Sequence, residues 1–322
     1  MIIKLEKNIN KEHWNDLVKN SFYSTVYHTW EWLESLKKTY LDWEIFYLMA
    51  YEKEKILAGL PIIKIKEKII RLRYFSSMWG SYGGVIVRDE ENFDIKEKML
   101  DYFKNFFSFW KIISIELVDF YSQNEFVKNM GFTEKKQIAL ILSLNNSLEE
   151  IWKEKIKYKI RKNVKRAENN GIEIKEITNI EMLKNCFHLI EQTNYRHKMK
   201  KVQYPYKLYE NMFLTMGSQN LIKWNVAFYK KIPIALLFSF VFKKNLVFWI
   251  NASSQEFWQH RPNDYLYWYQ IKWACLQNLT YANFGTTLEN NEELIRFKQS
   301  FGAEKKYYSI YTYFSSFLKL KQ

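Results

Sequence analysis

The stretch NFGTTLENNEELIRFKQSFGAEKKYY, residues 283–308, carries the strongest indication of the fold. It predicts the end of a strand over 281–284, a turn at Gly285 and a short helix over about 291–300. The helix is predicted to stop just before Gly302, because glycine readily takes the left-handed conformation that closes a helix. The stretch therefore reads as strand, turn, helix and a second strand.

The predicted helix has an apolar side with one cation next to it. Leu294, Ile295 and Phe297 are predicted to face a core, and Lys298 follows them directly. A lysine in this position either keeps its ammonium in water at the surface or directs a cation into a cleft. Position alone leaves both readings open.

A similar stretch occurs earlier in the chain without the lysine. Residues 126–136, FVKNMGFTEKK, match 297–306, FKQSFGAEKK, with Gly131 opposite Gly302. Val127 stands where the second stretch has its lysine. The match suggests that one structural unit was duplicated and that only the second copy carries the cation.

A second pair of segments supports this duplication. Residues 50–62 resemble residues 227–234, since each has an apolar strand, a charged turn and a strand entered through Pro-Ile. The chain of 322 residues is also long enough for two domains of about 150 residues each. We therefore predict two modules, 1–146 and 147–322.

Composition indicates a globular protein, since 48% of the residues are apolar and 18% are aromatic. Cys186 and Cys275 have no cysteine or histidine neighbours at metal-ligand spacing, so we expect reduced thiols and no metal site. The N-terminus does not resemble a secretory signal, and the longest apolar run, 232–242, is too short to span a membrane. The sequence therefore predicts a cytoplasmic protein.

The excess positive charge is concentrated in the second module. Residues 1–146 carry 21 basic and 20 acidic side chains, whereas 147–322 carry 28 and 15. Such an asymmetry favours an anionic partner for the second module, and phosphates of a nucleotide, a tRNA or a membrane surface would each fit.

The clearest helix is predicted at the start of the second module. Ser147 and Glu150 form a capping box, and Gly171 provides the stop. Basic residues recur at every fourth position, where like charges repel unless something anionic neutralises them. They indicate either a phosphate-binding face or a solvated helix surface, and they are Lys153, Lys157, Arg161 and Lys165.

A second basic element follows over 196–207. It contains five lysine or arginine residues and no acid, with Tyr204 and Tyr206 between them. Basic residues interleaved with aromatic rings are typical of surfaces that hold phosphates beside stacked rings. The alternative is a surface loop that is merely basic.

Known catalytic signatures give no match. The sequence has no HExxH, Cys-x-x-Cys, Walker, GxSxG or dinucleotide-binding pattern. The order of its local patterns nevertheless resembles that of the FemABX-like peptidyltransferases and the related BioF2-like acyltransferases, which belong to the GNAT superfamily. The resemblance rests on YHTWEWL, LPII, WGSYGGVIV, KYKIRKNVKRAENNGIEI, TNYRHK, NDYLYWYQIKWACLQN, YANFG and LIRFKQSFGAE.

The resemblance implies a mixed α/β protein with two tandem GNAT-like modules, each a mostly antiparallel twisted sheet flanked by helices. It also implies transfer of an acyl or aminoacyl group to an amine. Lys298 matches the position proposed in this family to stabilise the transition state. Arg196 matches a residue that grips acceptor phosphate, with help from Lys37 or Lys38.

Two departures from the family pattern bear on the donor. Asn283 stands where relatives often have aspartate, so this chain lacks the carboxylate at that position. The segment SSQEFWQHRPND, 253–264, lacks the Gly-rich pyrophosphate loop of acetyl-CoA-binding GNAT proteins, which argues against CoA.

We therefore expect an acyltransferase that needs no cofactor. The first expectation is aminoacyl transfer from aminoacyl-tRNA to an amine of a nucleotide-sugar or lipid-linked cell-envelope precursor, by a monomer. Lys298 would be catalytic, the acceptor would meet Lys37, Lys38, Arg196, Tyr204 and Tyr206, and donor phosphates would meet Lys157, Arg161 and Lys165. The alternatives are acyl-CoA-dependent N-acylation of an amino sugar or other small amine, and a non-catalytic binder of an anionic polymer.

Overall fold

The chain forms two compact units in the computed structural model, which describes residues 1–67, 71–79, 81–88, 93–107, 112–121, 125–199 and 203–314. The first unit comprises Met1–Gln137 with Tyr307–Gln322, and the second comprises Ile138–Lys306. The modules predicted from the sequence, 1–146 and 147–322, follow the chain order instead. The difference arises because strands β7 (Thr133–Ser143) and β13 (Glu304–Phe314) each begin in one unit and end in the other.

The first unit is built on a sheet with the strand order β1-β2-β3-β4-β6-β13, and the short strand β5 pairs with β3. The neighbours are antiparallel except for β4 and β6, which are parallel. The strands not yet defined are β1 (Ile2–Glu6), β2 (Glu44–Glu52), β3 (Lys55–Glu67), β4 (Arg71–Phe75), β5 (Ile86–Val87) and β6 (Ile112–Asp119).

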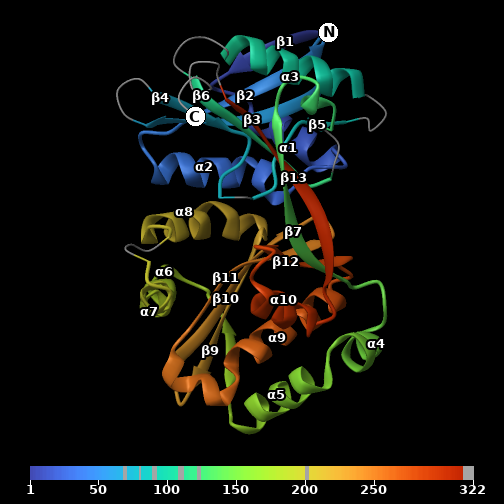
Figure 1. The fold of residues 1–322 in the computed structure, drawn as a ribbon. Helices are drawn as coiled ribbons and strands as arrows, with labels where there is room; N and C mark the ends of the chain where they lie inside the picture. The colour runs from blue at the N-terminus through green and yellow to red at the C-terminus, as the bar shows by residue number, and fades with distance from the viewer. Residues whose placement is uncertain are drawn as a thin grey trace. The chain divides into compact units, whose positions relative to one another are not determined.

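Helices cover both faces of this first sheet (Figure 1). Leu60 and Ile62 of β3 pack with Met99 of α3 on one face. On the other face, a side chain on Gly59 would meet the indole of Trp14 at 2.6 Å, so this glycine lets α1 approach the sheet closely. The helices are α1 (Lys11–Asn20), η1 (Val26–His28), α2 (Trp30–Thr39), α3 (Phe93–Phe107) and η2 (Glu125–Lys128).

The second unit is built on a sheet with the order β7-β12-β11-β10-β9-β8. Here β11 and β12 are parallel and the other pairs are antiparallel. The strands are β8 (Glu173–Glu176), β9 (Ile222–Tyr229), β10 (Ile232–Phe242), β11 (Asn245–Ser253) and β12 (Tyr281–Thr287).

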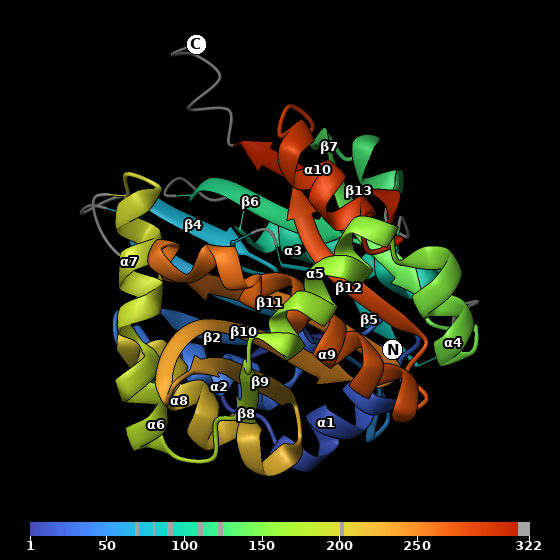
Figure 2. The same ribbon diagram turned by 90° about the horizontal axis from the view of Figure 1, so that it is seen from below.

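Two groups of helices pack against this second sheet. Leu237 faces a core with α5, α9 and α10, and Phe238, the next residue, meets Tyr209 of α8 on the opposite face. Figures 1 and 2 show α9 against the sheet with α5 beside it. The helices are α4 (Leu148–Glu150), η3 (Ile151–Lys155), α5 (Tyr158–Asn169), α6 (Ile180–Cys186), α7 (His188–Arg196), α8 (Tyr206–Met216), η4 (Gly217–Gln219), η5 (Gln255–His260), α9 (Pro262–Leu276) and α10 (Glu292–Gln299).

The predicted fold class is confirmed, since both sheets are mostly antiparallel and flanked by helices. The two repeat pairs also correspond in backbone structure. Gly131 and Gly302 both have a positive φ, +86° and +81°, and each lies two residues before the start of a strand, β7 or β13. The second pair forms the hairpins β2–β3 and β9–β10. Within the described residues, no helix is long and apolar enough to cross a membrane.

Candidate functional site

Lys298 lies on α10 and points into the second unit. The helix starts at Asn291, whose side chain accepts a hydrogen bond from the amide of Leu294, as the sequence stretch predicts. Ile295 and Lys298 are both only 5% exposed. Leu294, by contrast, is 37% exposed, so the prediction that it faces the core was wrong. The lysine is therefore a buried cation and not a surface residue.

The ammonium of Lys298 is held by the end of β12. Its Nζ donates to the carbonyl oxygens of Gly285 and Thr286, each at 3.2 Å, and to Oγ1 of Thr287 at 2.7 Å. Burial lowers the pKa of this lysine to about 8, because desolvation disfavours the charged form. Oδ1 of Asn283 accepts a hydrogen bond from the backbone amide of Gly285 at 2.8 Å, which stabilises the same turn.

The parallel strands β11 and β12 part just before this point. They pair only between Asn245–Val247 and Tyr281–Asn283, although β11 continues to Ser253. The rings of Phe248, Phe284 and Tyr267 pack together beyond the last pair. The backbone of β11 on this side is therefore not bonded to β12, and a buried ammonium lies at the end of the partner strand. Such an arrangement offers hydrogen-bond donors to a developing oxyanion.

The predicted helix over 147–171 is interrupted, which changes the position of its basic residues. The capping box of Ser147 and Glu150 is present, but a π-helical segment, η3, follows and the backbone is extended at Ile156 and Lys157. The amide of Lys157 donates to the carbonyl of Ser300 at 2.9 Å. The break thus joins the start of α5 to the end of α10.

Arg161 has a structural role at this break. One guanidinium nitrogen donates to the carbonyl oxygens of Trp152, Lys153 and Ile156, at 3.3, 2.7 and 2.5 Å. These carbonyls end the preceding helical segment and would otherwise be unsatisfied. The bonds engage one nitrogen of the guanidinium that the sequence predicts to bind donor phosphate, so Arg161 stabilises the break whatever its other role.

A cavity of about 580 Å³ lies where α5, α9 and α10 meet. Four cations border it, Lys157, Lys159, Arg261 and Arg296, against the two acids Asp264 and Glu293. Lys165 is exposed further along α5. The excess of positive charge makes the cavity suited to an anionic group.

Asp264 is the buried acid of this cavity. It is 7% exposed, and its carboxylate accepts a hydrogen bond from Nδ2 of Asn163 at 2.7 Å. Burial raises the pKa of Asp264, and the bond from Asn163 opposes that rise. The residue was not expected from the sequence, although the run Arg261-Pro262-Asn263-Asp264 has the proline typical of a helix start.

Arg196 lies beside the same cavity. Its guanidinium donates to the carbonyl of Ser253 at 3.0 Å and to Oγ1 of Thr193 at 3.3 Å, and it lies 4.8 Å from the ring centre of Trp258. Trp258 borders the cavity and donates its Nε1 hydrogen to Oγ of Ser253 at 2.9 Å. The arginine predicted to bind acceptor phosphate is thus also packed against a wall of the cationic cavity.

The other predicted acceptor residues differ in their surroundings. Tyr204 is only 4% exposed and stacks on Trp249. The ring of Tyr206 packs edge-on against Phe187. Lys200 and Lys201 of the basic element lie outside the described residues. Lys37 and Lys38 are exposed in the last turn of α2, in the first unit.

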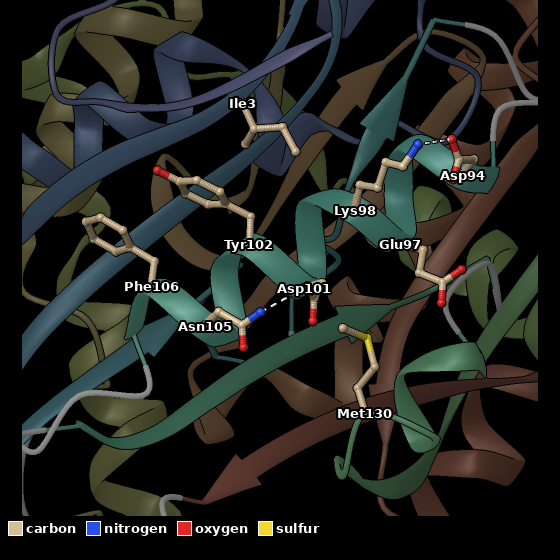
Figure 3. Close-up of a pocket in the computed structure, with 9 residues that line it drawn as sticks. All are labelled: Ile3, Asp94, Glu97, Lys98, Asp101, Tyr102, Asn105, Phe106 and Met130. Carbon is tan, nitrogen blue, oxygen red and sulfur yellow. Dashed lines mark hydrogen bonds and ion pairs between the residues drawn. The ribbon is translucent and has the colours of Figure 1, made fainter.

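A second hollow lies in the first unit, around α3 (Figure 3). It is lined by Ile3 and by polar and aromatic side chains of α3, among which Lys98 pairs with Asp94 and Asn105 donates to Asp101. None of the site residues predicted from the sequence lines it. The candidate site is therefore placed in the second unit.

Comparison with known proteins agrees with this placement. Residues 154–299 match a family model described as an acetyltransferase (GNAT) domain, and this segment contains Lys298 and most of the cationic cavity. None of the curated proteins matched the sequence.

Several solved structures share the fold of the whole chain. FemX is similar with a TM-score of 0.79 and 14% identity over 100% of this chain and 99% of its own. L-PGS from Bacillus licheniformis has a TM-score of 0.61 and 12% identity, over 96% of this chain and 93% of its own. A tandem GNAT protein from the clavulanic acid biosynthesis pathway has a TM-score of 0.60 and 10% identity, over 97% of this chain and 98% of its own.

These similarities define the class of protein. The chain has the tandem GNAT fold, and the acetyltransferase (GNAT) domain matched in its second half indicates an acyltransferase. Its fold is FemX-like, and the resemblance to the FemABX-like proteins is confirmed.

Proposed function

We propose that this protein transfers an aminoacyl group from aminoacyl-tRNA to an amine of a cell-envelope precursor. The observation that carries the proposal is the buried ammonium of Lys298 at the end of β12, where β11 and β12 have parted. A fixed cation at such a place stabilises the negative charge that forms when an amine attacks an ester. The resemblance to the FemABX-like proteins supports an aminoacyl donor.

The proposed reaction needs no covalent enzyme intermediate. The acceptor amine attacks the ester carbonyl, a C–N bond forms, and the tetrahedral oxyanion accepts a hydrogen bond from Lys298. The C–O bond to the ribose then breaks, and the leaving hydroxyl takes the proton lost by the amine. Since the ammonium already has three acceptors, one of the longer bonds, to Gly285 or Thr286, must yield to the oxyanion.

The pH dependence of the transfer step tests the charge state of Lys298. Because its pKa is about 8, the ammonium is largely intact below pH 8 and is lost as the pH rises further. We expect the single-turnover rate of the wild type to fall above pH 8. The Lys298→Arg variant should lack this fall, since its guanidinium stays charged. A rate that climbs through pH 8 in the wild type but not in Lys298→Arg would instead assign the neutral amine of Lys298 as a base.

The outer face of α5 supports tRNA as the donor. Lys159, Lys162, Lys165 and Arg166 are exposed, and none is ion-paired with a carboxylate among the described residues. Unpaired cations along one helix repel each other unless phosphates neutralise them. The face is contiguous with the cationic cavity, because Lys159 belongs to both.

We expect tRNA binding to depend steeply on salt and to weaken when this face is neutralised. The double variant Lys162→Gln/Lys165→Gln should lower the slope of log affinity against log salt by about 1 to 2, as each lost phosphate contact removes about one counterion. Fluorescence titration at several salt concentrations gives the slope. Lys184→Gln on α6, another exposed lysine, is the control. An unchanged slope in the double variant would exclude α5 from the RNA contact.

For the acceptor, we propose that Arg196 binds phosphate of a nucleotide sugar or lipid carrier. Arg196 is suited to this because its fork of donors can engage phosphate oxygens. Replacing Arg196 with Lys should raise the KM for the acceptor.

Acyl-CoA remains the second candidate donor, because the matched family model is an acetyltransferase domain and the cavity would accept a pyrophosphate. Transfer assays with acetyl-CoA and with aminoacyl-tRNA, run on the same amine, separate the two. Turnover with acetyl-CoA alone would replace the tRNA proposal. Binding without transfer from either donor would favour a non-catalytic role.

A further inference from the structure

One aromatic side chain in the cationic cavity is not explained by phosphate binding. Trp258 is 40% exposed, and it borders the cavity that several charged side chains line. Leaving an indole open to water forgoes the free energy of burying it. Such a ring beside several cations is typical of sites where a nucleotide places its base on an aromatic surface and its phosphates on cations.

The orientation of this indole is fixed by three neighbours. Arg196 lies 4.8 Å from its ring centre, and Nε1 donates to Oγ of Ser253. That hydroxyl also accepts a hydrogen bond from Nδ2 of Asn263 at 3.1 Å, so it links η5 to the first turn of α9. The ring therefore cannot rotate freely, and Trp258 lines the cavity together with Lys157 and Arg261. A rigid aromatic surface loses little entropy when a planar ligand stacks on it.

We infer that Trp258 is the stacking surface for the base of a purine nucleotide whose phosphates bind Lys157, Lys159 and Arg261. The inference rests on the proposed donor site and names the part of the donor that the site recognises. Both aminoacyl-tRNA and acyl-CoA end in an adenosine with phosphate attached, so the shared ligand chemistry is an adenine nucleotide. Arg196 is a positioning residue here, since it acts on the base only through the indole.

The test compares ligands with and without a base on the full-length protein. Adenosine 3′,5′-bisphosphate carries base and phosphates, whereas inorganic pyrophosphate carries charge alone. Trp258→Ala should weaken binding of the bisphosphate about tenfold, which is the usual cost of losing one base–aromatic stack. Binding of pyrophosphate should stay unchanged, and Trp258→Phe should restore most of the loss.

Matched variants separate stacking from structural damage. Tyr281 is 42% exposed in the same unit and does not border the cavity, so Tyr281→Ala should leave both affinities unchanged. Arg196→Ala, measured without acceptor, should weaken binding of the bisphosphate and leave binding of pyrophosphate unchanged. Quenching of tryptophan fluorescence by the bisphosphate should be smaller in Trp258→Phe than in the wild type.

The outcomes distinguish this inference from the proposed function. If Trp258→Ala binds the bisphosphate as well as the wild type does, the stacking role is refuted while the anionic site remains. If the wild type binds neither probe, the donor site itself is refuted. CoA and a short RNA ending in CCA serve as the source probes, and the one that binds the wild type and is weakened in Trp258→Ala identifies the donor.

Discussion

Replacing Lys298 with Met is expected to lower the transfer rate by about 10²- to 10³-fold, the usual cost of removing one donor to an oxyanion. Methionine has nearly the same length and can occupy the buried site, but it cannot donate a hydrogen bond. Affinity for the acceptor should be unchanged, because the acceptor phosphate is assigned to other residues. Single-turnover assays with the donor already bound measure this step directly.

A control must show that the loss comes from chemistry and not from unfolding. Lys298 is bonded to two carbonyls and a hydroxyl, so its removal also leaves buried acceptors without a donor. Thr287→Val removes only the hydroxyl and keeps the cation, and it should retain most of the activity. Lys305→Met changes an exposed lysine of β13 and should retain all of it. Full transfer by a folded Lys298→Met protein would end the catalytic assignment.

The largest expected effect on stability comes from Gly302→Ala. Gly302 has φ +81°, and a Cβ there would lie 2.7 Å from Cβ of Lys155 and 2.9 Å from its carbonyl oxygen. The left-handed backbone and the forced contact together should cost about 3 kcal/mol of unfolding free energy. The contact cannot be relieved by a side-chain rotation, because one of the two atoms belongs to the backbone. Urea denaturation of the variant measures the loss.

Gly171→Ala is the matched control for this steric argument. Gly171 has a similar φ of +73°, but no atom lies within 4 Å of its expected Cβ. Only the cost of the left-handed backbone conformation remains, so the unfolding free energy should fall by about 1 kcal/mol. Equal losses in the two variants would show that the contact with Lys155 has no effect of its own.

The elements near the opening stretch were predictable from the sequence because their determinants are local. Asn291 caps the start of α10, and Gly302 follows its end. The capping box of Ser147 and Glu150 starts α4. The break at Ile156 and Lys157 was not predictable. Its causes are tertiary, namely the bond from Lys157 to Ser300 and the capping of carbonyls by Arg161. Apolar spacing continues through the break and conceals it.

The site was predictable only where a residue type stood out. Lys298 stood out in the sequence because its earlier counterpart is Val127, but its hydrogen-bond partners Gly285 and Thr287 carry no signal in a single sequence. The burial of Tyr204 was not predictable, because an aromatic ring between lysines looks the same in the sequence whether it is buried or exposed. Trp258 was missed because it becomes part of a site only when α5, α9 and α10 meet around it.

The exchange of β7 and β13 bears on how the chain can be divided. The later residues of β7 pair with β12 in the second unit, and the later residues of β13 pair with β6 in the first. This is the reciprocal strand donation of a domain-swapped dimer, contained here in one polypeptide. Cutting the chain between the sequence repeats would leave each fragment without its borrowed strand and with an open sheet edge prone to aggregation. A separately expressed second unit would therefore have to end where the strands pass from one unit to the other, and not between the two sequence repeats.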